Sequence, residues 1–96
     1  MLEKTITTAI IRYLCSLPHC FCWKQHGGQF GTAGIPDIIV CLDGRFVAFE
    51  VKTESGKLTK LQESALRKIT AANGRAYTVT SLNQVKQIIE NMGGGL

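Results

Sequence analysis

The sequence lacks any apolar run approaching the roughly 20 residues that a membrane-spanning helix requires. Its first residues include Glu3 and Lys4 within a helical pattern, which is unlike the apolar core of a secretory signal peptide. Internal repeats, low-complexity blocks and linkers are also missing from the sequence. We therefore expect a soluble, cytoplasmic protein without a membrane partner.

The chain is also short, and it carries fewer acidic than basic residues. Its 96 residues are too few for two ordinary domains, whereas a hydrophobic content of 45% allows one small core. We expect a single domain over residues 1–92 and a flexible glycine tail over residues 93–96. Seven Asp and Glu against eleven Lys and Arg give a net charge of +4, which suits a polyanionic partner such as nucleic acid.

The sequence lacks a usual zinc signature, although it contains four cysteines. Cys15, Cys20 and Cys22 lie close to two histidines, but the spacings differ from those of paired structural zinc ligands. All four cysteines, Cys41 included, sit in or beside apolar segments, where a free thiol behaves as a small hydrophobic group. Reduced thiols are therefore favoured over a structural zinc site.

A glycine-rich stretch covers residues 27–34. It lacks the Gly-Lys-Ser/Thr ending of a phosphate-binding P-loop, so nucleotide hydrolysis of that kind is excluded. The glycines permit either a close approach of the backbone to another group or simply sharp turns.

The rest of the sequence alternates helical and strand patterns. Apolar residues at helical spacing predict three helices, over residues 2–17, 59–73 and 82–92. Runs rich in β-branched and aromatic residues predict four strands, over residues 20–26, 37–42, 46–52 and 76–80. The order is α-β-β-β-α-β-α, and the helix between the last two strands makes them parallel neighbours. The predicted fold class is α/β, a mixed sheet flanked by helices.

A predicted hairpin brings two distant acids together. Asp43-Gly44, between the second and third strands, is the strongest short hairpin signal in the chain. The register set by a two-residue loop places Asp37 directly opposite Glu50, with Cβ atoms about 4.5 to 5.5 Å apart. Alternation along the third strand puts Lys52 on the same face as Glu50. The two carboxylates and the amine therefore converge.

Two interpretations of this cluster compete. Half-exposed strands often carry a surface salt-bridge cluster, which contributes about 0 to 1 kcal/mol. The strands that carry these charges are, however, largely apolar, as expected for strands covered on both faces. Charges at the ends of such strands are costly unless something offsets their repulsion, and Mg²⁺ or Mn²⁺ prefers carboxylate oxygens. The cluster therefore favours a metal site.

Several motifs resemble one nuclease family when taken together. These are Gly34-Ile35-Pro36-Asp37, then Glu50-Val51-Lys52 after a strand and hairpin, then Gln62 early in the next helix. The pattern resembles the PD-(D/E)xK nuclease superfamily, and within it the small standalone VRR-NUC domains of phages and bacteria. The similarity runs from about Trp23 through Ser81. It implies a restriction-endonuclease-like core and metal-dependent hydrolysis of DNA phosphodiester bonds.

The resemblance also implies roles for the site residues. Asp37 and Glu50 would bind Mg²⁺ or Mn²⁺, the Val51 carbonyl would add a ligand, and Lys52 would orient or activate the attacking water. Standalone members are expected to act as homodimers on branched DNA, such as four-way (Holliday) junctions, in a bacterial cell. The alternative is a non-catalytic nucleic-acid-binding module of the same fold, against which the complete set of Asp37, Glu50 and Lys52 argues.

Two outer residues have competing explanations. Gln62 aligns with the inward face of its helix, which suits an active-site role, but it also fits a capping box with Thr59. The two roles are compatible. Glu3 borders the apolar face of the first helix and, by the resemblance, matches a glutamate near the metal. A glutamate favoured by the helix dipole at that position explains it equally well.

Contacts to DNA are expected around the glycine-rich loop and before the second predicted helix. Phosphate-contacting side chains in these segments are predicted at Lys24, His26, Gln29, Lys57 and Lys60. Scattered lysines that merely solvate the surface are the competing explanation.

Overall fold

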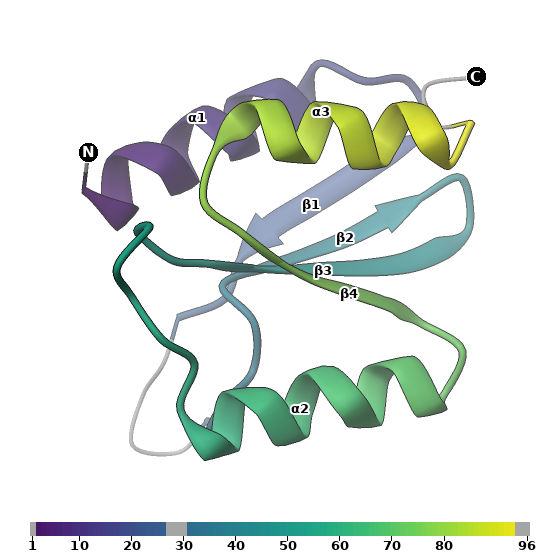
Figure 1. The fold of residues 1–96 in the computed structure, drawn as a ribbon. Helices are drawn as coiled ribbons and strands as arrows, with labels where there is room; N and C mark the ends of the chain where they lie inside the picture. The colour runs from purple at the N-terminus through teal and green to yellow at the C-terminus, as the bar shows by residue number, and fades with distance from the viewer. Residues whose placement is uncertain (1, 27–30, 94–96) are drawn as a thin grey trace.

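The computed structural model describes residues 2–26 and 31–93 and has three layers. One sheet lies in the middle, with α1 and α3 on one face and α2 on the other (Figure 1). The helices are α1 (Glu3–Cys15), α2 (Lys60–Ala71) and α3 (Leu82–Asn91), and the strands are β1 (Cys20–Lys24), β2 (Ile38–Leu42), β3 (Arg45–Val51) and β4 (Arg75–Val79). The predicted order α-β-β-β-α-β-α is confirmed. In the described residues, no helix is long and apolar enough to cross a membrane.

The sheet has the predicted mixed topology. Its strand order is β1-β2-β3-β4, with antiparallel pairing up to β3 and parallel pairing between β3 and β4. Asp43 and Gly44 both have positive φ, 51° and 80°, as a two-residue hairpin of the primed type requires. Leu42 therefore pairs with Arg45, and the ladder runs back to Ile38 opposite Phe49. The next step of this register places Asp37 opposite Glu50, so the predicted register is confirmed.

The main core lies between the sheet and the layer formed by α1 and α3. Helix α1 contributes Ile6, Ile10 and Leu14, which recur at helical spacing, and α3 contributes Val85 and Ile89. Alternate residues of β2 and β3 complete it from the sheet side. Burying each such aliphatic side chain stabilises the fold by about 1.5 to 3 kcal/mol.

The cysteines are free thiols. The sulfur atoms of Cys15 on α1 and Cys22 on β1 lie 3.7 Å apart. Cys20 and Cys22 pack against the core, and burial raises the pKa of both thiols. Among the residues that the structure describes, no three His, Cys, Asp or Glu side chains gather into a metal-binding cluster.

The opposite face of the sheet is covered less completely. Helix α2 has no fully buried residue, and Leu61, which was predicted on its apolar face, is 60% exposed. Phe46 and Cys41 are also exposed, so the prediction that β2 and β3 are covered on both faces is wrong at the hairpin end. The physical reason is that α2 is a single helix and does not span the four strands. Glu50 lies on this face.

Some predictions fall outside the described residues. Residues 27–30 of the glycine-rich stretch, including Gln29, are not described, and the same holds for residues 94–96 of the predicted glycine tail. Gly93 is described and has a φ of 67° after α3.

Candidate active site

The site forms where the β2–β3 ladder ends. Asp37 comes directly before β2, and its carboxylate Oδ2 accepts a hydrogen bond from the backbone N–H of Val51 at 2.8 Å. The side chain thus takes a backbone donor at the last position of β3. Asp37 is half-buried. This bond fixes its carboxylate beside Glu50, the neighbouring residue on β3.

Glu50 is buried, with only 2% of its surface exposed. Its Oε2 accepts a hydrogen bond from Gln62 Nε2 at 3.3 Å, whereas its Oε1 is buried without any hydrogen-bond partner. A buried polar oxygen without a partner costs about 1 to 3 kcal/mol, and more when it is charged. Buried polar atoms of this kind occur at strained and catalytic positions and where a water or an ion binds.

The environment of Glu50 opposes its ionisation. The pKa of Glu50 is raised to about 8 because the carboxyl group is buried and because the Asp37 carboxylate lies beside it. The positive charge of Lys52 lowers the pKa, whereas Glu3 raises it further. Two converging acids with one strongly perturbed pKa are typical of a functional site.

Gln62 forms the predicted capping box and also contacts Glu50. Its Oε1 accepts from the backbone N–H of Thr59 at 2.9 Å, and its own N–H donates to the Thr59 hydroxyl at 3.1 Å, which completes a capping box at the start of α2. Because Oε1 is engaged by Thr59, the amide NH₂ faces Glu50. The helix cap therefore also orients the donor to Glu50.

Lys52 and Glu3 act on Glu50 through their charges. Lys52 follows β3, is half-buried, and lowers the pKa of Glu50. Glu3 is the exposed first residue of α1, and its charge is among the causes that raise this pKa. The chain thus brings both residues into the electrostatic neighbourhood of the acid pair.

A divalent cation fits the acid pair. Asp37 and Glu50 offer carboxylate oxygens, and the orphaned Oε1 of Glu50 is a donor that nothing in the protein satisfies. The described residues bring no third acid, His or Cys into a cluster with them. Mg²⁺ sites commonly use only one or two carboxylates and complete their shell with waters and substrate phosphate oxygens. The donor set therefore suits Mg²⁺ or Mn²⁺.

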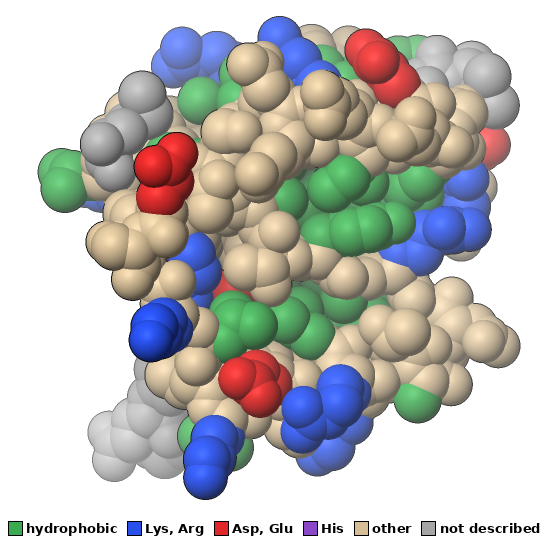
Figure 2. All heavy atoms as spheres, viewed as in Figure 1, with side chains coloured by type: hydrophobic (Ala, Val, Ile, Leu, Met, Phe, Trp, Pro, Cys, Tyr) green, Lys and Arg blue, Asp and Glu red, His purple; other side chains and the backbone are tan. Residues whose placement is uncertain are grey.

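Basic side chains surround this face of the molecule. Lys57, between β3 and α2, and Lys60, the first residue of α2, are exposed, as are Lys24 at the end of β1 and His26 two residues beyond it. Figure 2 shows Lys and Arg side chains on the α2 layer and also on the opposite layer of the molecule. The role of these residues in DNA contacts stays a prediction, and Gln29 lies outside the described residues.

The sequence-based prediction missed one part of the site. Val51 was expected to contribute its carbonyl, but the structure shows its N–H holding Asp37. The hairpin register could have predicted this bond. The ladder ends at Ile38 opposite Phe49, so the backbone N–H of Val51 lies beyond the last pair and is available to the side chain of Asp37. A carboxylate at that position can accept it.

Two solved structures share this fold. One, a "VRR_NUC domain", superposes with a TM-score of 0.77 at 24% identity and covers 92% of this chain and 94% of its own. The other, a "VRR_NUC domain protein", has a TM-score of 0.74 at 15% identity and covers 94% of this chain and 86% of its own. No protein-family model and no curated protein matches the sequence. The expected resemblance is thus confirmed in three dimensions: the chain has the restriction-endonuclease-like fold of a VRR_NUC domain.

Proposed function

We propose that the chain is a metal-dependent endonuclease that hydrolyses DNA phosphodiester bonds. The observation that carries this proposal is the buried Glu50, whose unpartnered oxygen lies beside Asp37 at the end of a hairpin. The fold shared with VRR_NUC domains supports a nuclease over other metal-binding proteins. The net charge of +4 suits a polyanionic substrate.

The residues divide the work as follows. Asp37 and Glu50 would hold Mg²⁺ or Mn²⁺, and the Val51 carbonyl would be a further ligand, as the resemblance implies. The cation, when bound, lowers the pKa of a water and neutralises charge on the phosphate. Lys52 orients the attacking water and stabilises the negative charge that develops on the phosphate oxygens. Gln62 holds Oε2 of Glu50, which leaves Oε1 for the metal.

Glu3 belongs to the outer part of the same site. Its charge reaches Glu50 from the first turn of α1. We propose that it lies near the bound metal at the edge of the site, as the resemblance to VRR-NUC domains implies, without joining Asp37 and Glu50 in one ligand cluster. The competing explanation is an acid that the helix dipole favours at the start of α1.

The proposed substrate is branched DNA, such as a four-way junction. The resemblance implies this preference, and the exposed Lys24, His26, Lys57 and Lys60 supply phosphate contacts on two sides of the site. Phosphate contacts of this kind carry no sequence information, which suits recognition of a DNA shape.

We further propose a homodimer. The support is an open apolar patch on the α2 side of the sheet, made of Phe21, Trp23, Cys41 and Phe46. Phe21 is 69% exposed and its ring centroid lies 5.6 Å from that of Trp23. Contiguous exposed apolar groups mark interaction surfaces. A second copy would cover the patch and enlarge the surface available to DNA.

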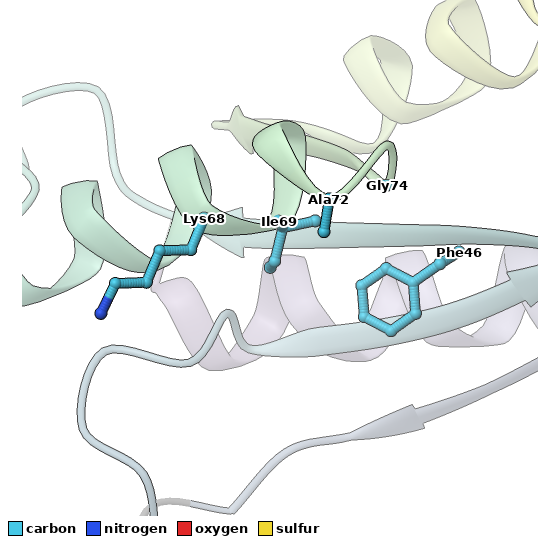
Figure 3. A pocket seen from close by; sticks show the side chains of 5 residues that line it. All are labelled: Phe46, Lys68, Ile69, Ala72 and Gly74. Carbon is cyan, nitrogen blue, oxygen red and sulfur yellow. The ribbon is translucent and has the colours of Figure 1, made fainter.

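A pocket of about 350 Å³ adjoins this open apolar patch. Figure 3 shows Ile69 of α2 and Ala72, the residue that follows α2, pointing toward Phe46 of β3, with Gly74 behind them. The lining of the pocket is almost entirely apolar, and the aliphatic stem of Lys68 forms one side of it. An apolar side chain of a partner subunit would fill such a pocket.

Cleavage assays test the proposal. Linear, flap and four-way-junction DNA are incubated with Mg²⁺, with Mn²⁺ and with EDTA. We expect cleavage of the junction with either metal, none with EDTA, and a loss of at least about 100-fold in Asp37→Ala and Lys52→Ala. Matched controls on α3, Glu90→Ala and Lys86→Ala, should cleave normally because both side chains are exposed on the other layer.

Two outcomes would contradict this function. Cleavage in EDTA, or cleavage undiminished in both site variants, would overturn the mechanism. Binding of junction DNA without cleavage by any metal-loaded form would instead support the alternative, a non-catalytic nucleic-acid-binding module with this fold.

A further inference from the structure

Gly34 lies unusually close to the start of α2. A Cβ atom added at Gly34 would sit 2.4 Å from the carbonyl oxygen of Leu61, 2.6 Å from its carbonyl carbon and 3.0 Å from the backbone nitrogen of Gln62. All three atoms belong to the backbone of the first turn of α2. No change of rotamer can therefore relieve the overlap, and a side chain at this position would push the loop and the helix apart.

This contact joins the two segments that supply the site. Gly34 stands three residues before Asp37, and the atoms it touches belong to Gln62 and its neighbour. Gln62 Nε2 reaches Glu50 Oε2 at 3.3 Å, a length at which a small further separation would break the bond. The spacing between loop and helix thus sets whether the amide touches Glu50.

Helix α2 is held against the sheet without any fully buried side chain. Leu61, beside the contact, is 60% exposed. A helix with fully buried residues resists displacement more strongly than one whose contacts with the sheet are made only by half-buried residues. An extra methyl group at Gly34 would therefore shift the start of α2.

We propose that Gly34 is a positioning residue of the active site, whose missing side chain lets α2 approach closely enough for Gln62 to hold Glu50. This inference rests on the proposed nuclease function for its meaning, but the contact itself can be tested without catalysis. It also explains one glycine of the glycine-rich stretch: its backbone approaches the protein's own helix.

Two glycines with similar φ angles allow the steric overlap of an added side chain to be distinguished from backbone strain. Gly34 and Gly44 have nearly the same φ, 83° and 80°, so alanine strains the backbone similarly at both. A Cβ at Gly44 meets nothing within 4 Å, whereas a Cβ at Gly34 meets Leu61. Gly44→Ala is therefore the control for Gly34→Ala.

The first measurement is steady-state cleavage of four-way-junction DNA. We expect Gly34→Ala to lower kcat by about 100-fold with a nearly unchanged KM, since a small misplacement of a site group has an effect of this size. Gly44→Ala should stay within about twofold of the wild type. Equal losses in both variants, or a normal kcat in a folded Gly34→Ala protein, would overturn the proposal.

A double-mutant cycle identifies Gln62 as the residue through which Gly34 acts. If Gly34 works by placing the Gln62 amide, Gly34→Ala should have little further effect once Gln62→Met has removed that amide. The double variant should therefore lose no more cleavage activity than Gln62→Met alone. A double variant that loses the product of the two single effects would show that Gly34 acts elsewhere, against the proposal.

The second measurement does not depend on activity. In a ¹⁵N–¹H spectrum, the side-chain NH₂ signals of Gln62 should move in Gly34→Ala and remain in place in Gly44→Ala. The wild-type protein should show nuclear Overhauser contacts between the Gly34 α-protons and the Gln62 backbone amide, and their absence would contradict the proposal even if Gly34→Ala does not fold. A protein that shows these contacts but cleaves no DNA would leave the positioning intact and remove the nuclease function instead.

Discussion

Glu50 is the residue whose ionisation couples most directly to the fold. Its pKa is about 8, raised from 4.5 by burial and by Asp37. Below about pH 4.5, Glu50 carries its proton in both the folded and the unfolded state, and the contribution of this proton to the stability of the fold is complete. Between 4.5 and 8 only the unfolded state ionises readily, so stability declines as the pH rises. Without metal, Glu50 therefore stabilises the fold more in acid.

This linkage gives a prediction for stability. In EDTA, the free energy of unfolding should fall by a few kcal/mol between pH 5 and pH 8, measured by urea denaturation. Glu50→Gln keeps the shape of the side chain but cannot ionise, so its unfolding free energy should lack this decline. Parallel curves for the wild type and Glu50→Gln would show that the pH dependence has another source.

The same proton should compete with the metal. Because a metal ligand must be deprotonated, each Mn²⁺ that binds below pH 8 displaces the proton of Glu50. The apparent affinity for Mn²⁺ should therefore rise about tenfold per pH unit between pH 6 and pH 7.5. Calorimetry at several pH values measures it, with Glu50→Gln as the control that should bind weakly at every pH. A constant affinity in the wild type contradicts the assignment.

The acid pair was predictable from sequence, whereas its partners were only partly so. Asp43-Gly44 determines the turn, and the turn determines that Asp37 faces Glu50. Such local rules need no knowledge of the rest of the fold. The approach of Gly34 to α2 depends on how close two distant backbone segments come, which side-chain patterns do not encode.

At the scale of elements, the capping box of α2 has a dual role in holding the helix and the site. The Thr59 hydroxyl accepts from Gln62 N–H, and Gln62 in turn reaches Glu50. Ser81 caps α3 in a similar way, accepting from Gln84 N–H at 3.2 Å, but α3 lies on the other face of the sheet. The two caps therefore form a natural comparison.

We predict that the two caps are equal in stability and unequal in function. Thr59→Ala and Ser81→Ala should each lower the free energy of unfolding by about 1 kcal/mol. Only Thr59→Ala should also slow DNA cleavage, because a frayed α2 start misplaces Gln62, and Thr59→Ser should restore both properties. Stability by urea denaturation and kcat on junction DNA check this. Equal cleavage rates in Thr59→Ala and Ser81→Ala would show that the α2 cap does not influence the active site.

The elements themselves were predicted well because their signals are strong and local. Every predicted helix and strand is present, and the bounds differ by one or two residues at most ends. The burial of α2 was predicted poorly. Helical spacing placed Leu61 on the apolar face, but spacing does not reveal that a single helix must cover this face of the sheet. Coverage depends on the packing of the complete sheet.

At the scale of the whole molecule, the two sheet faces have different tasks. The α1 and α3 side holds the closed core, with Phe49, Val47 and Val51 of β3 fully buried. The α2 side holds Glu50 at one end of the strands and Phe46 at the other, separated by Ala48. Strand alternation thus lets β3 serve the core with one set of residues and the site and the open apolar patch with the other.

The homodimer prediction belongs to this scale. Light scattering should give about twice the chain mass of 10.5 kDa for the wild type. Phe21→Ser combined with Trp23→Ser should give a monomer, because both side chains belong to the open apolar patch and would lose their burial against a second copy. Leu2→Ser is the matched control: Leu2 is 74% exposed but precedes α1, in the other layer, and its loss should leave the dimer intact. A patch variant that remains dimeric would place the interface elsewhere. A dimeric patch variant with weakened DNA binding would assign these aromatic side chains to the substrate, since exposed aromatic rings also stack on unpaired bases.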